Sequence, residues 1–230
     1  MKYLGKRMKC LDLFSGKGGF SEGFRKRGHE VTRYDFNKDF EEVPHTIIKD
    51  VFDLTADDLQ GADIILASID CTYLTYANPQ PDPKALLESL SLAQHTLKII
   101  QEAHPKFWVI ENPPGRLKHV LGPPVIKTAW GFWGTPYLKP TWLWGILPFM
   151  IWPTRYTEPE PNPEWDLKKY KHNKFAYLAK RQGKDRSFIP LSFSEALCIA
   201  AENDTHYQTT LTRPEIVEGS PSLLDSEVIK

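Results

Sequence analysis

Cys71 and Glu111 are the two side chains of this sequence that are best placed for chemistry. Cys71 follows the near-continuous apolar run 62–68, and Glu111 follows the apolar run 107–110. Such runs predict strands covered on both faces in a parallel sheet, and ligands gather at the carboxyl ends of these strands. Cys71 is therefore the cysteine that we expect to be reactive. The alternatives are a buried, inert thiol and, for Glu111, a helix cap or a salt-bridge partner.

A glycine-rich turn within residues 11–24 (LDLFSGKGGFSEGF) predicts a nucleotide-sized pocket. Strand-compatible residues lead into Gly16, Gly18 and Gly19, and a helical pattern begins directly after them. Glycines allow positive φ angles and close backbone approach, and the free N–H groups at a helix start point at a polar ligand. The next strand-like run ends at Asp35, about 20 residues past the glycines, where dinucleotide-binding folds place an acid on ribose hydroxyls. The alternative is a tight turn whose glycines serve packing alone.

A second acid with a binding pattern is Asp50, which apolar Val51 follows after the short strand candidate 46–48. A carboxylate of this kind can bond an adenine amino group while the apolar neighbour covers one face of the ring. A solvated loop acid has the same pattern, so both interpretations stay open.

Predicted strands alternate with helical segments over the first 120 residues, which indicates an α/β fold with a Rossmann-like, doubly wound, mostly parallel sheet. Residues 84–103 give the clearest helix, and the proline-rich loop 73–83 before them is long enough to cover an active site. A length of 230 residues favours one domain, which we place at residues 1–202. Within it, region 153–186 is a proline-rich connection and basic insert, and residues 203–230 are expected to form a disordered tail.

The composition excludes several classes of protein. The formal net charge is zero, with 29 basic and 29 acidic residues, so any nucleic-acid surface must be a local basic patch. The three cysteines are far apart and form no CxxC pair, which argues against a disulfide framework and against a metal site. The N-terminus lacks the apolar core of a signal peptide, and the longest apolar run, 141–152, is too short to span a bilayer. We expect a soluble, intracellular (cytoplasmic) protein without membrane contact.

Two further stretches have compositions that nucleic-acid surfaces use. Residues 129–152 hold five of the seven tryptophans, for which core strands and turns are the simpler interpretation and a base-stacking surface the alternative. Residues 168–186 hold eight lysines and arginines interleaved with three aromatic residues. This basic stretch is the best candidate in the sequence for contacts with phosphates, with an ordinary solvated loop as the alternative.

Taken in order, these features resemble the DNA cytosine-5 methyltransferases, a family that uses S-adenosylmethionine. The resemblance runs over residues 9–147, with a weaker match at residues 186–201. The motif DLFSGKGGFSEGF is similar to the family's cofactor loop, DLFxGxGGxxxGF, and Cys71 and Glu111 lie 40 residues apart, about the family's usual separation of catalytic cysteine and glutamate. The resemblance implies cofactor contacts from Phe14, Ser15, Gly16, Gly18, Gly19, Asp35, Phe36, Asp50 and Val51.

The chemistry of this family explains the residue types, because carbon 5 of cytosine is a poor nucleophile. The resemblance implies that Cys71 attacks carbon 6 and so turns the ring into an enamine that accepts the methyl group. Glu111, bonded to ring nitrogen 3, would stabilise the negative charge, and the base would be flipped out of double-stranded DNA. Asp70 joins the implied catalytic group, and the implied substrate contacts are Thr75, Asn112, Lys139 and Thr141.

Three features depart from the family pattern. Asp70 replaces the usual proline. Its carboxylate should raise the thiol pKa of Cys71, and an aspartate lacks the fixed φ angle of a proline. We therefore expect weak activity unless a cation such as Lys139 neutralises Asp70. Residues 137–141 (YLKPT) stand in place of the arginine-bearing QxRxR motif. Only about 40 residues separate this segment from Arg186, and the family usually inserts a large target-recognition domain between the corresponding positions. We therefore expect low sequence specificity or a partner subunit.

Two other functions stay open at this point. One is methyl transfer to another substrate, such as a base amino group, RNA or a free nucleotide. Asn112-Pro113-Pro114 faintly resembles the xPP-aromatic motif of amino methyltransferases, although Gly115 replaces the aromatic residue. The other is a catalytically lapsed fold that serves as a nucleic-acid-binding or regulatory subunit, which Asp70 favours.

Overall fold

The computed structural model describes residues 7–135, 137–155, 157 and 188–203. The basic stretch 168–186 and the chain from residue 204 onward lie outside these residues, so the predictions made for them stay predictions. Within the described part of the chain, no helix is both long and apolar enough to cross a membrane.

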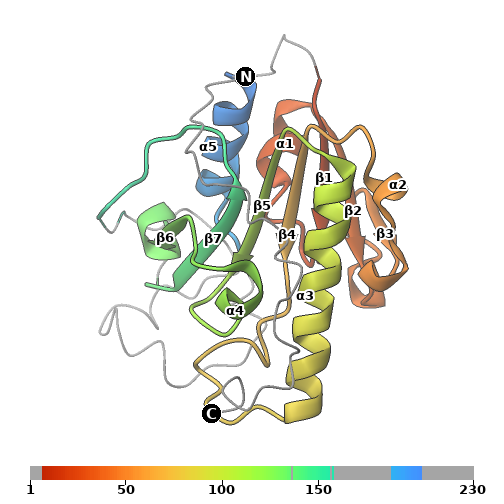
Figure 1. Ribbon diagram of the computed structural model, residues 1–230. Helices are drawn as coiled ribbons and strands as arrows, with labels where there is room; N and C mark the ends of the chain where they lie inside the picture. Colours follow the sequence, from red (N-terminus) through yellow and green to blue (C-terminus); the bar gives the residue numbers. More distant parts are fainter. Residues whose placement is uncertain (1–6, 136, 156, 158–187, 204–230) are drawn as a thin grey trace.

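A single seven-stranded sheet in the order β3-β2-β1-β4-β5-β7-β6 forms the centre of the described structure (Figure 1). Strands β1 to β5 run parallel to one another, and β7 runs antiparallel between β5 and β6. The pairing sets Ser68 opposite Glu111 at the carboxyl ends of two neighbouring strands. The strands are β1 (Lys9–Leu13), β2 (Glu30–Asp35), β3 (Thr46–Ile48), β4 (Ile64–Ser68), β5 (Phe107–Asn112), β6 (Ile126–Ala129) and β7 (Pro140–Ile146).

Helices cover both faces of this sheet, as an apolar parallel strand requires. Alternate residues of β4 show the two layers, because Ile65 packs into the core under α3 while Ile64 packs into the core under α5. The α-helices of the described chain are α1 (Glu22–Arg27) and α5 (Leu191–Glu202) on one face, and α2 (Ala56–Leu59), α3 (Pro83–Ala103) and α4 (Lys118–Leu121) on the other. Short 3-10 helices occur at η1 (Lys38–Phe40), η2 (Val51–Asp53) and η3 (Trp130–Trp133). The predicted doubly wound α/β class is confirmed.

Helix α3 illustrates why the local sequence folds in this way. The Asp82 carboxylate caps the helix by accepting a hydrogen bond from the Ala85 N–H at 2.9 Å, and Pro83 occupies the first turn, where its missing N–H costs nothing. The helix ends at His104, whose φ of 50° is left-handed. The helix thus begins one residue before the predicted range 84–103 and ends with it.

The tryptophan-rich stretch forms core. Trp130, Trp133 and Trp144 are buried, and the first two pack against Phe193 of α5 with ring centroids 5.0 and 5.2 Å apart. A base-stacking surface is therefore wrong for these three rings. Residues 130–133 form a 3-10 helix rather than a strand, and Gly134 ends it with a positive φ.

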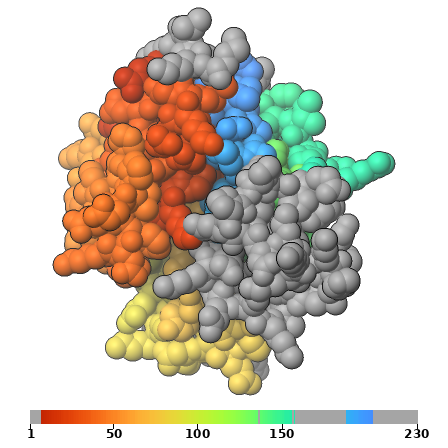
Figure 2. All heavy atoms as spheres, turned by 180° about the vertical axis from the view of Figure 1, so that it is seen from behind, coloured from red at the N-terminus to blue at the C-terminus, as the bar shows by residue number. Residues whose placement is uncertain are grey.

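Helix α5 lies against α1 although the two are far apart in the chain, and Figure 2 shows the blue C-terminal helix beside the red N-terminal segments. The Ser194 hydroxyl donates to the Phe20 carbonyl at 2.6 Å and accepts the Gly23 N–H at 2.8 Å. A Cβ at Gly23 would overlap the backbone of Ser194, so only glycine permits this approach. Helix α5, which falls mostly within the weaker family match at residues 186–201, thus supports the glycine turn.

Candidate active site

A cavity of about 130 Å³ joins the glycine turn to the two strand ends that carry Cys71 and Glu111. The neighbouring strand ends at Ser68 and Glu111 bring together residues from β1, β4 and β5 at the carboxyl edge of the sheet, as predicted. The cavity is lined by Phe14, Ser15, Gly16, Lys17, Gly19, Phe20, Ser68, Ile69, Asp70, Cys71, Glu111, Pro113, Lys139, Phe188 and Ile189.

The glycine turn rests on a buried arginine that the sequence analysis did not single out. Arg33 of β2 is 1% exposed, and a Cβ at Gly18, whose φ is +77°, would overlap its guanidinium group. Arg33 donates to the Ser21 hydroxyl at 2.9 Å, to the Gly18 carbonyl at 3.0 Å and to the Pro44 carbonyl at 2.9 Å. The side chain therefore fixes the turn from behind, and Gly18 is required for the close approach.

Asp12 extends this buried polar layer beneath the turn. Its carboxylate accepts the Ser21 hydroxyl at 2.6 Å, and its side chain is fully buried. Burial raises the pKa of Asp12 from 3.8 to about 6, against the opposing effects of Ser21 and Arg33. Asp12, Ser21 and Arg33 are named here the Asp12–Arg33 network.

Asp35 lies where β2 ends, but its carboxylate is already used by the protein. One oxygen accepts the Gly16 N–H at 2.8 Å and the other accepts the Asn37 N–H at 2.9 Å. It therefore orients the turn, and it does not line the cavity. The next residue, Phe36, is 68% exposed, so its ring is available to a ligand.

The second predicted acid pair lies further along the same edge of the sheet. Asp50 caps η2 by accepting the Phe52 N–H at 2.9 Å. Val51 is buried and packs into the core with Leu54, which leaves little of its surface for a ligand. Neither residue lines the cavity.

Cys71 is half-buried on the cavity wall. Burial is the main cause that raises the pKa of its thiol, and the carboxylates of Glu111 and Asp70 raise it further, while Lys139 acts in the opposite direction. The direction predicted for Asp70 is confirmed, but burial contributes more. Lys139 lies on the same wall, as the resemblance implied.

Asp70 restrains its own loop through hydrogen bonds. Its carboxylate accepts both the Thr72 N–H at 3.0 Å and the Thr72 hydroxyl at 2.7 Å. This two-residue turn limits the backbone by a side-chain contact, where a proline would limit it through its ring. Asp70 lacks the fixed φ angle of a proline, and its hydrogen bonds to Thr72 restrain the loop in another way.

Asn112 and Thr141 lie outside the cavity lining, although both were predicted to contact the substrate. Both are fully buried. The Thr141 hydroxyl donates to the Glu111 carboxylate and lies 3.3 Å from the Asn112 carbonyl, and the Asn112 amide donates to the Ile69 carbonyl at 2.7 Å. These two side chains therefore position Glu111 and the backbone that leads to Cys71.

Thr75 also lies away from the cavity, in the loop after Cys71, where its hydroxyl accepts the Ala77 N–H. The loop is fastened to the segment after Glu111 by a β-bridge between Thr75 and Gly115. Arg116 adds hydrogen bonds to the carbonyls of Thr75, Asn78 and Pro79 at 3.1, 3.1 and 3.2 Å. The predicted loop exists, and in this structure it is held closed against its neighbour.

Two buried hydroxyls indicate that the cavity suits a polar ligand. Ser15 Oγ and Ser68 Oγ line it, and neither has a hydrogen-bond partner among the described residues. A buried hydroxyl without a partner is unfavourable unless a ligand or water supplies one. The sequence analysis missed Ser68, although it is the polar last residue of an otherwise apolar strand.

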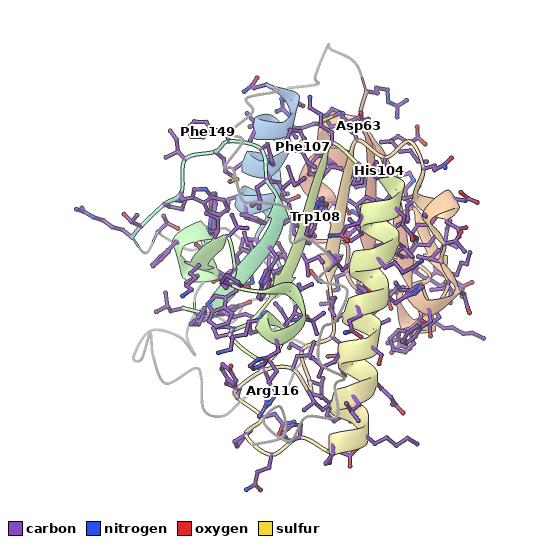
Figure 3. All side chains as sticks on the ribbon, in the orientation of Figure 1. Asp63, His104, Phe107, Trp108, Arg116 and Phe149 are labelled. Atoms are coloured by element: carbon purple, nitrogen blue, oxygen red, sulfur yellow. The ribbon has the colours of Figure 1, made fainter. Side chains whose placement is uncertain are left out.

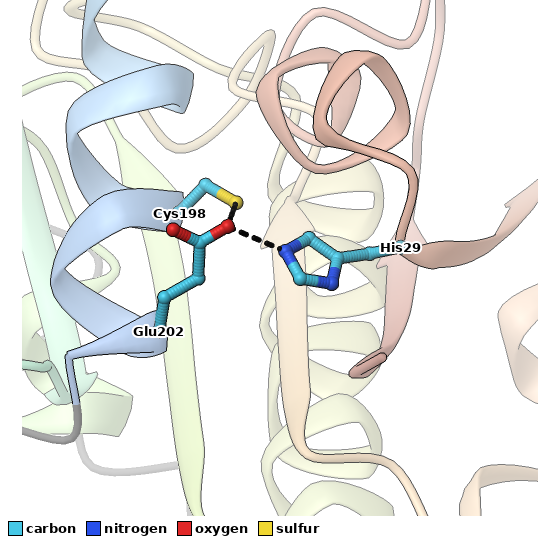
Figure 4. A group of neighbouring side chains, drawn as sticks. All are labelled: His29, Cys198 and Glu202. Carbon is cyan, nitrogen blue, oxygen red and sulfur yellow. Dashed lines mark hydrogen bonds and ion pairs between the residues drawn. The ribbon is translucent and has the colours of Figure 1, made fainter. Parts of the chain in front are cut away.

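Outside the cavity, His29, Cys198 and Glu202 bring three potential metal ligands together (Figure 4). Their ligand atoms are already engaged, because Arg27 binds both Glu202 oxygens at 2.7 and 2.6 Å. His29 accepts the Met8 N–H through Nδ1, which leaves Nε2 to donate to Glu202 at 2.9 Å. Burial strongly raises the pKa of Cys198, which favours the neutral thiol. The cluster fastens α5 to the end of α1 and to the turn before β2.

The fold and site together define a class of protein. A doubly wound sheet with an antiparallel β7, and a glycine turn facing a ligand cavity, is the Rossmann-like arrangement of S-adenosylmethionine-dependent methyltransferases. Residues 8–127, just over half of the chain, match the C-5 cytosine-specific DNA methylases, and the chain belongs to this family. Membership implies S-adenosylmethionine as the methyl donor.

Two curated relatives agree with this assignment. The type II methyltransferase M.FnuDI of Fusobacterium nucleatum is 28% identical over 120 residues, which cover 48% of this chain and 33% of that protein. M.XorII of Xanthomonas oryzae pv. oryzae is 27% identical over 127 residues, which cover 46% of this chain and 28% of that protein. The chain thus matches only about a third of each relative's length.

Among solved structures, the S. pombe Dnmt2 methyltransferase is similar with 17% identity and a TM-score of 0.44, over 61% of this chain and 49% of that one.

Proposed function

We propose that this protein transfers a methyl group from S-adenosylmethionine to carbon 5 of cytosine in DNA through a covalent adduct at Cys71. The observation that carries the proposal is the cavity that joins the glycine turn to Cys71, Glu111 and Lys139. A methyl donor and its acceptor must meet in one enclosed space, and this cavity is bounded by both groups of residues.

The donor would lie along the glycine turn. The exposed ring of Phe36 and the unpartnered Ser15 hydroxyl fit a ligand with an aromatic base and polar groups. Asp35 keeps the Gly16 N–H in place, and Asp50 follows it in the order in which the family's cofactor-binding acids occur. When bound, S-adenosylmethionine supplies a methyl group on a positively charged sulfur.

Cys71 would act as the nucleophile. Its Sγ forms a bond to carbon 6 of the cytosine, and the ring electrons move to carbon 5, which then takes the methyl group. A base removes the proton from carbon 5, carbon 5 and carbon 6 regain their double bond, and Sγ leaves as the thiolate. Lys139 on the same wall favours this thiolate, since it lowers the pKa of Cys71.

Glu111 would stabilise the ring during the attack by bonding to nitrogen 3. The Thr141 hydroxyl donates a hydrogen bond to the Glu111 carboxylate, and the Asn112 carbonyl is a second acceptor for it. Thr141 is therefore a positioning residue in this mechanism. Extrusion of the base from duplex DNA and a partner subunit for sequence recognition belong to the same proposal.

The experiment incubates the full chain with methyl-labelled S-adenosylmethionine and duplex DNA, and then identifies the labelled nucleoside. Label in 5-methylcytosine, together with a covalent complex on 5-fluorocytosine DNA that Cys71→Ala abolishes, supports the proposal. Cys10→Ala serves as the matched control, because Cys10 lies on β1, buried in the core under α5, and its loss should leave both readouts intact. Label in another nucleoside or in RNA would show that the substrate is not cytosine in DNA. Failure to bind S-adenosylmethionine would overturn the proposal.

One observation favours a catalytically lapsed, DNA-binding role as the second candidate. The pKa of Cys71 is raised, and two carboxylates contribute to this shift. Binding of S-adenosylmethionine and DNA with no methyl transfer over the range from neutral to alkaline pH would identify that role. Methyl transfer that rises with pH as the thiol ionises would exclude it.

A further inference from the structure

Tyr76 of the Cys71 loop forms a surface group with Arg116 and Lys118, named here the Tyr76 patch. The Tyr76 ring is 45% exposed, and two cations lie over it. The Lys118 Nζ is 5.4 Å and the Arg116 guanidinium carbon is 5.6 Å from the ring centroid. Cations at these distances are attracted by the ring, which therefore holds both charges in place.

The positive charge of this patch has no acidic partner within the described part of the chain. Among the described residues, no carboxylate lies within ion-pair distance of Arg116 or Lys118, whereas Arg25, Lys49 and Lys98 each pair with an acid. Arg116 gives its three hydrogen bonds to neutral carbonyl groups. An arginine has five N–H donors, so two remain for another ligand.

The neighbouring His119 reports the same local field. Burial lowers the pKa of this imidazole, and the charges of Lys118 and Arg116 lower it further. Among the described residues this positive charge is unpaired with any acid, and such a local excess of positive charge in a chain with zero net charge favours a polyanion over a neutral partner.

The patch is built from both catalytic segments. Tyr76 belongs to the loop that follows Cys71, and its N–H donates to the Pro114 carbonyl at 3.1 Å, in the segment that follows Glu111. In Figure 3, Arg116 lies at the end of the sheet opposite to Asp63, His104 and Phe107. That end is the carboxyl edge of the sheet. The strand ends at Ser68 and Glu111, which line the cavity, lie at the same edge.

We propose that the Tyr76 patch binds a backbone phosphate of duplex DNA, close to the nucleotide whose base enters the cavity. This inference rests on the proposed function for the identity of the polymer. Two cations held by one ring, with free N–H donors beside them, match a single phosphate group and carry no information about sequence. A phosphate there would also tie the Cys71 loop to the segment after Glu111.

The test measures DNA binding without any methyl transfer. A labelled duplex is titrated with the full chain at several salt concentrations, and the slope of log affinity against log salt is compared between variants. Lys118→Ala removes one phosphate contact, so the slope should become shallower by about 0.9. The affinity at about 0.1 M salt should fall about eightfold, and the difference should vanish towards about 1 M salt.

Lys98→Ala is the matched control, because Lys98 is an exposed lysine near the C-terminal end of α3 and pairs with Glu102. It should leave slope and affinity unchanged. A Lys118→Ala slope equal to that of the wild type would overturn the proposal, and so would a loss of affinity that does not depend on salt. An effect confined to duplex RNA would assign the patch to that polymer and also overturn it.

Binding of S-adenosylmethionine and methyl transfer, measured on the same preparations, separate the two proposals. A changed salt slope without methyl transfer by the wild type would keep the patch and reject the proposed activity. Methyl transfer with an unchanged slope would reject the patch alone.

Discussion

The glycine turn and the Cys71 loop both line one cavity, but they are held in different ways. The turn rests on buried groups, namely the Asp12–Arg33 network and the Ser194 hydroxyl of α5. The Cys71 loop is held by half-buried or exposed contacts, namely the Asp70–Thr72 turn and the Arg116 hydrogen bonds. Buried polar contacts are costly to break, whereas exposed ones exchange readily with water. The wall at the donor side is therefore fixed, and the wall at the nucleophile can open.

The largest effect is expected from Arg33→Met, which removes the cation under the glycine turn. The Gly18 carbonyl and the Ser21 hydroxyl would lose a buried hydrogen-bond partner, and Glu22 would lose its buried cation, so the free energy of unfolding should fall by about 3–5 kcal/mol. Urea denaturation measures this loss. Arg25→Ala breaks a partly exposed ion pair with Glu22 and should cost less, about 1 kcal/mol. Equal losses in the two variants would break the comparison.

Asp12→Asn tests the same network through pH. Because burial raises the pKa of Asp12 in the folded protein to about 6, the folded state prefers the protonated form, and this contribution to stability is lost as pH rises from about 4 to about 6. Asp12→Asn should lack the loss. Its unfolding free energy relative to the wild type should therefore increase by about 3 kcal/mol between these limits. A pH-independent difference would contradict the prediction.

Arg116→Ala should act on the other wall. It removes three hydrogen bonds from the carbonyls of the Cys71 loop, so amide exchange there should accelerate about tenfold, which corresponds to the net loss of about one hydrogen bond. Hydrogen exchange on peptides covering residues 72–82 measures the change. Peptides of the glycine turn serve as the internal control and should exchange as in the wild type. Faster exchange in both regions would show that the walls are coupled.

The smallest effect is expected from Asp70→Asn. The amide oxygen can still accept the Thr72 N–H, but the charge that raises the pKa of Cys71 is gone. Alkylation of Cys71 at neutral pH should therefore accelerate by about 1.5- to 5-fold, as expected for one exposed charge pair. Cys10 and Cys198 are buried and should stay unmodified in both proteins. Slower alkylation would mean that the negative charge helps the thiolate.

The sequence predicted the strands and the long helix well because apolar spacing reports which faces are buried. It also placed Cys71, Glu111 and Lys139 on one wall. It could not reveal Arg33 or Arg116, because their partners come from distant segments that no local pattern connects. It likewise placed Thr141 with the substrate, whereas the pairing of β7 beside β5 directs its hydroxyl to Glu111.

The contact between Ser194 and the glycine turn has a consequence for how the protein is made. The hydroxyl bonds to residues that lie 171 and 174 positions earlier in the chain. A ribosome releases the glycine turn long before it adds Ser194, so the N-terminal segment waits for its last support while translation continues. Any shortened product that stops before α5 lacks this support. The donor-side wall thus matures only in chains whose synthesis has passed α5.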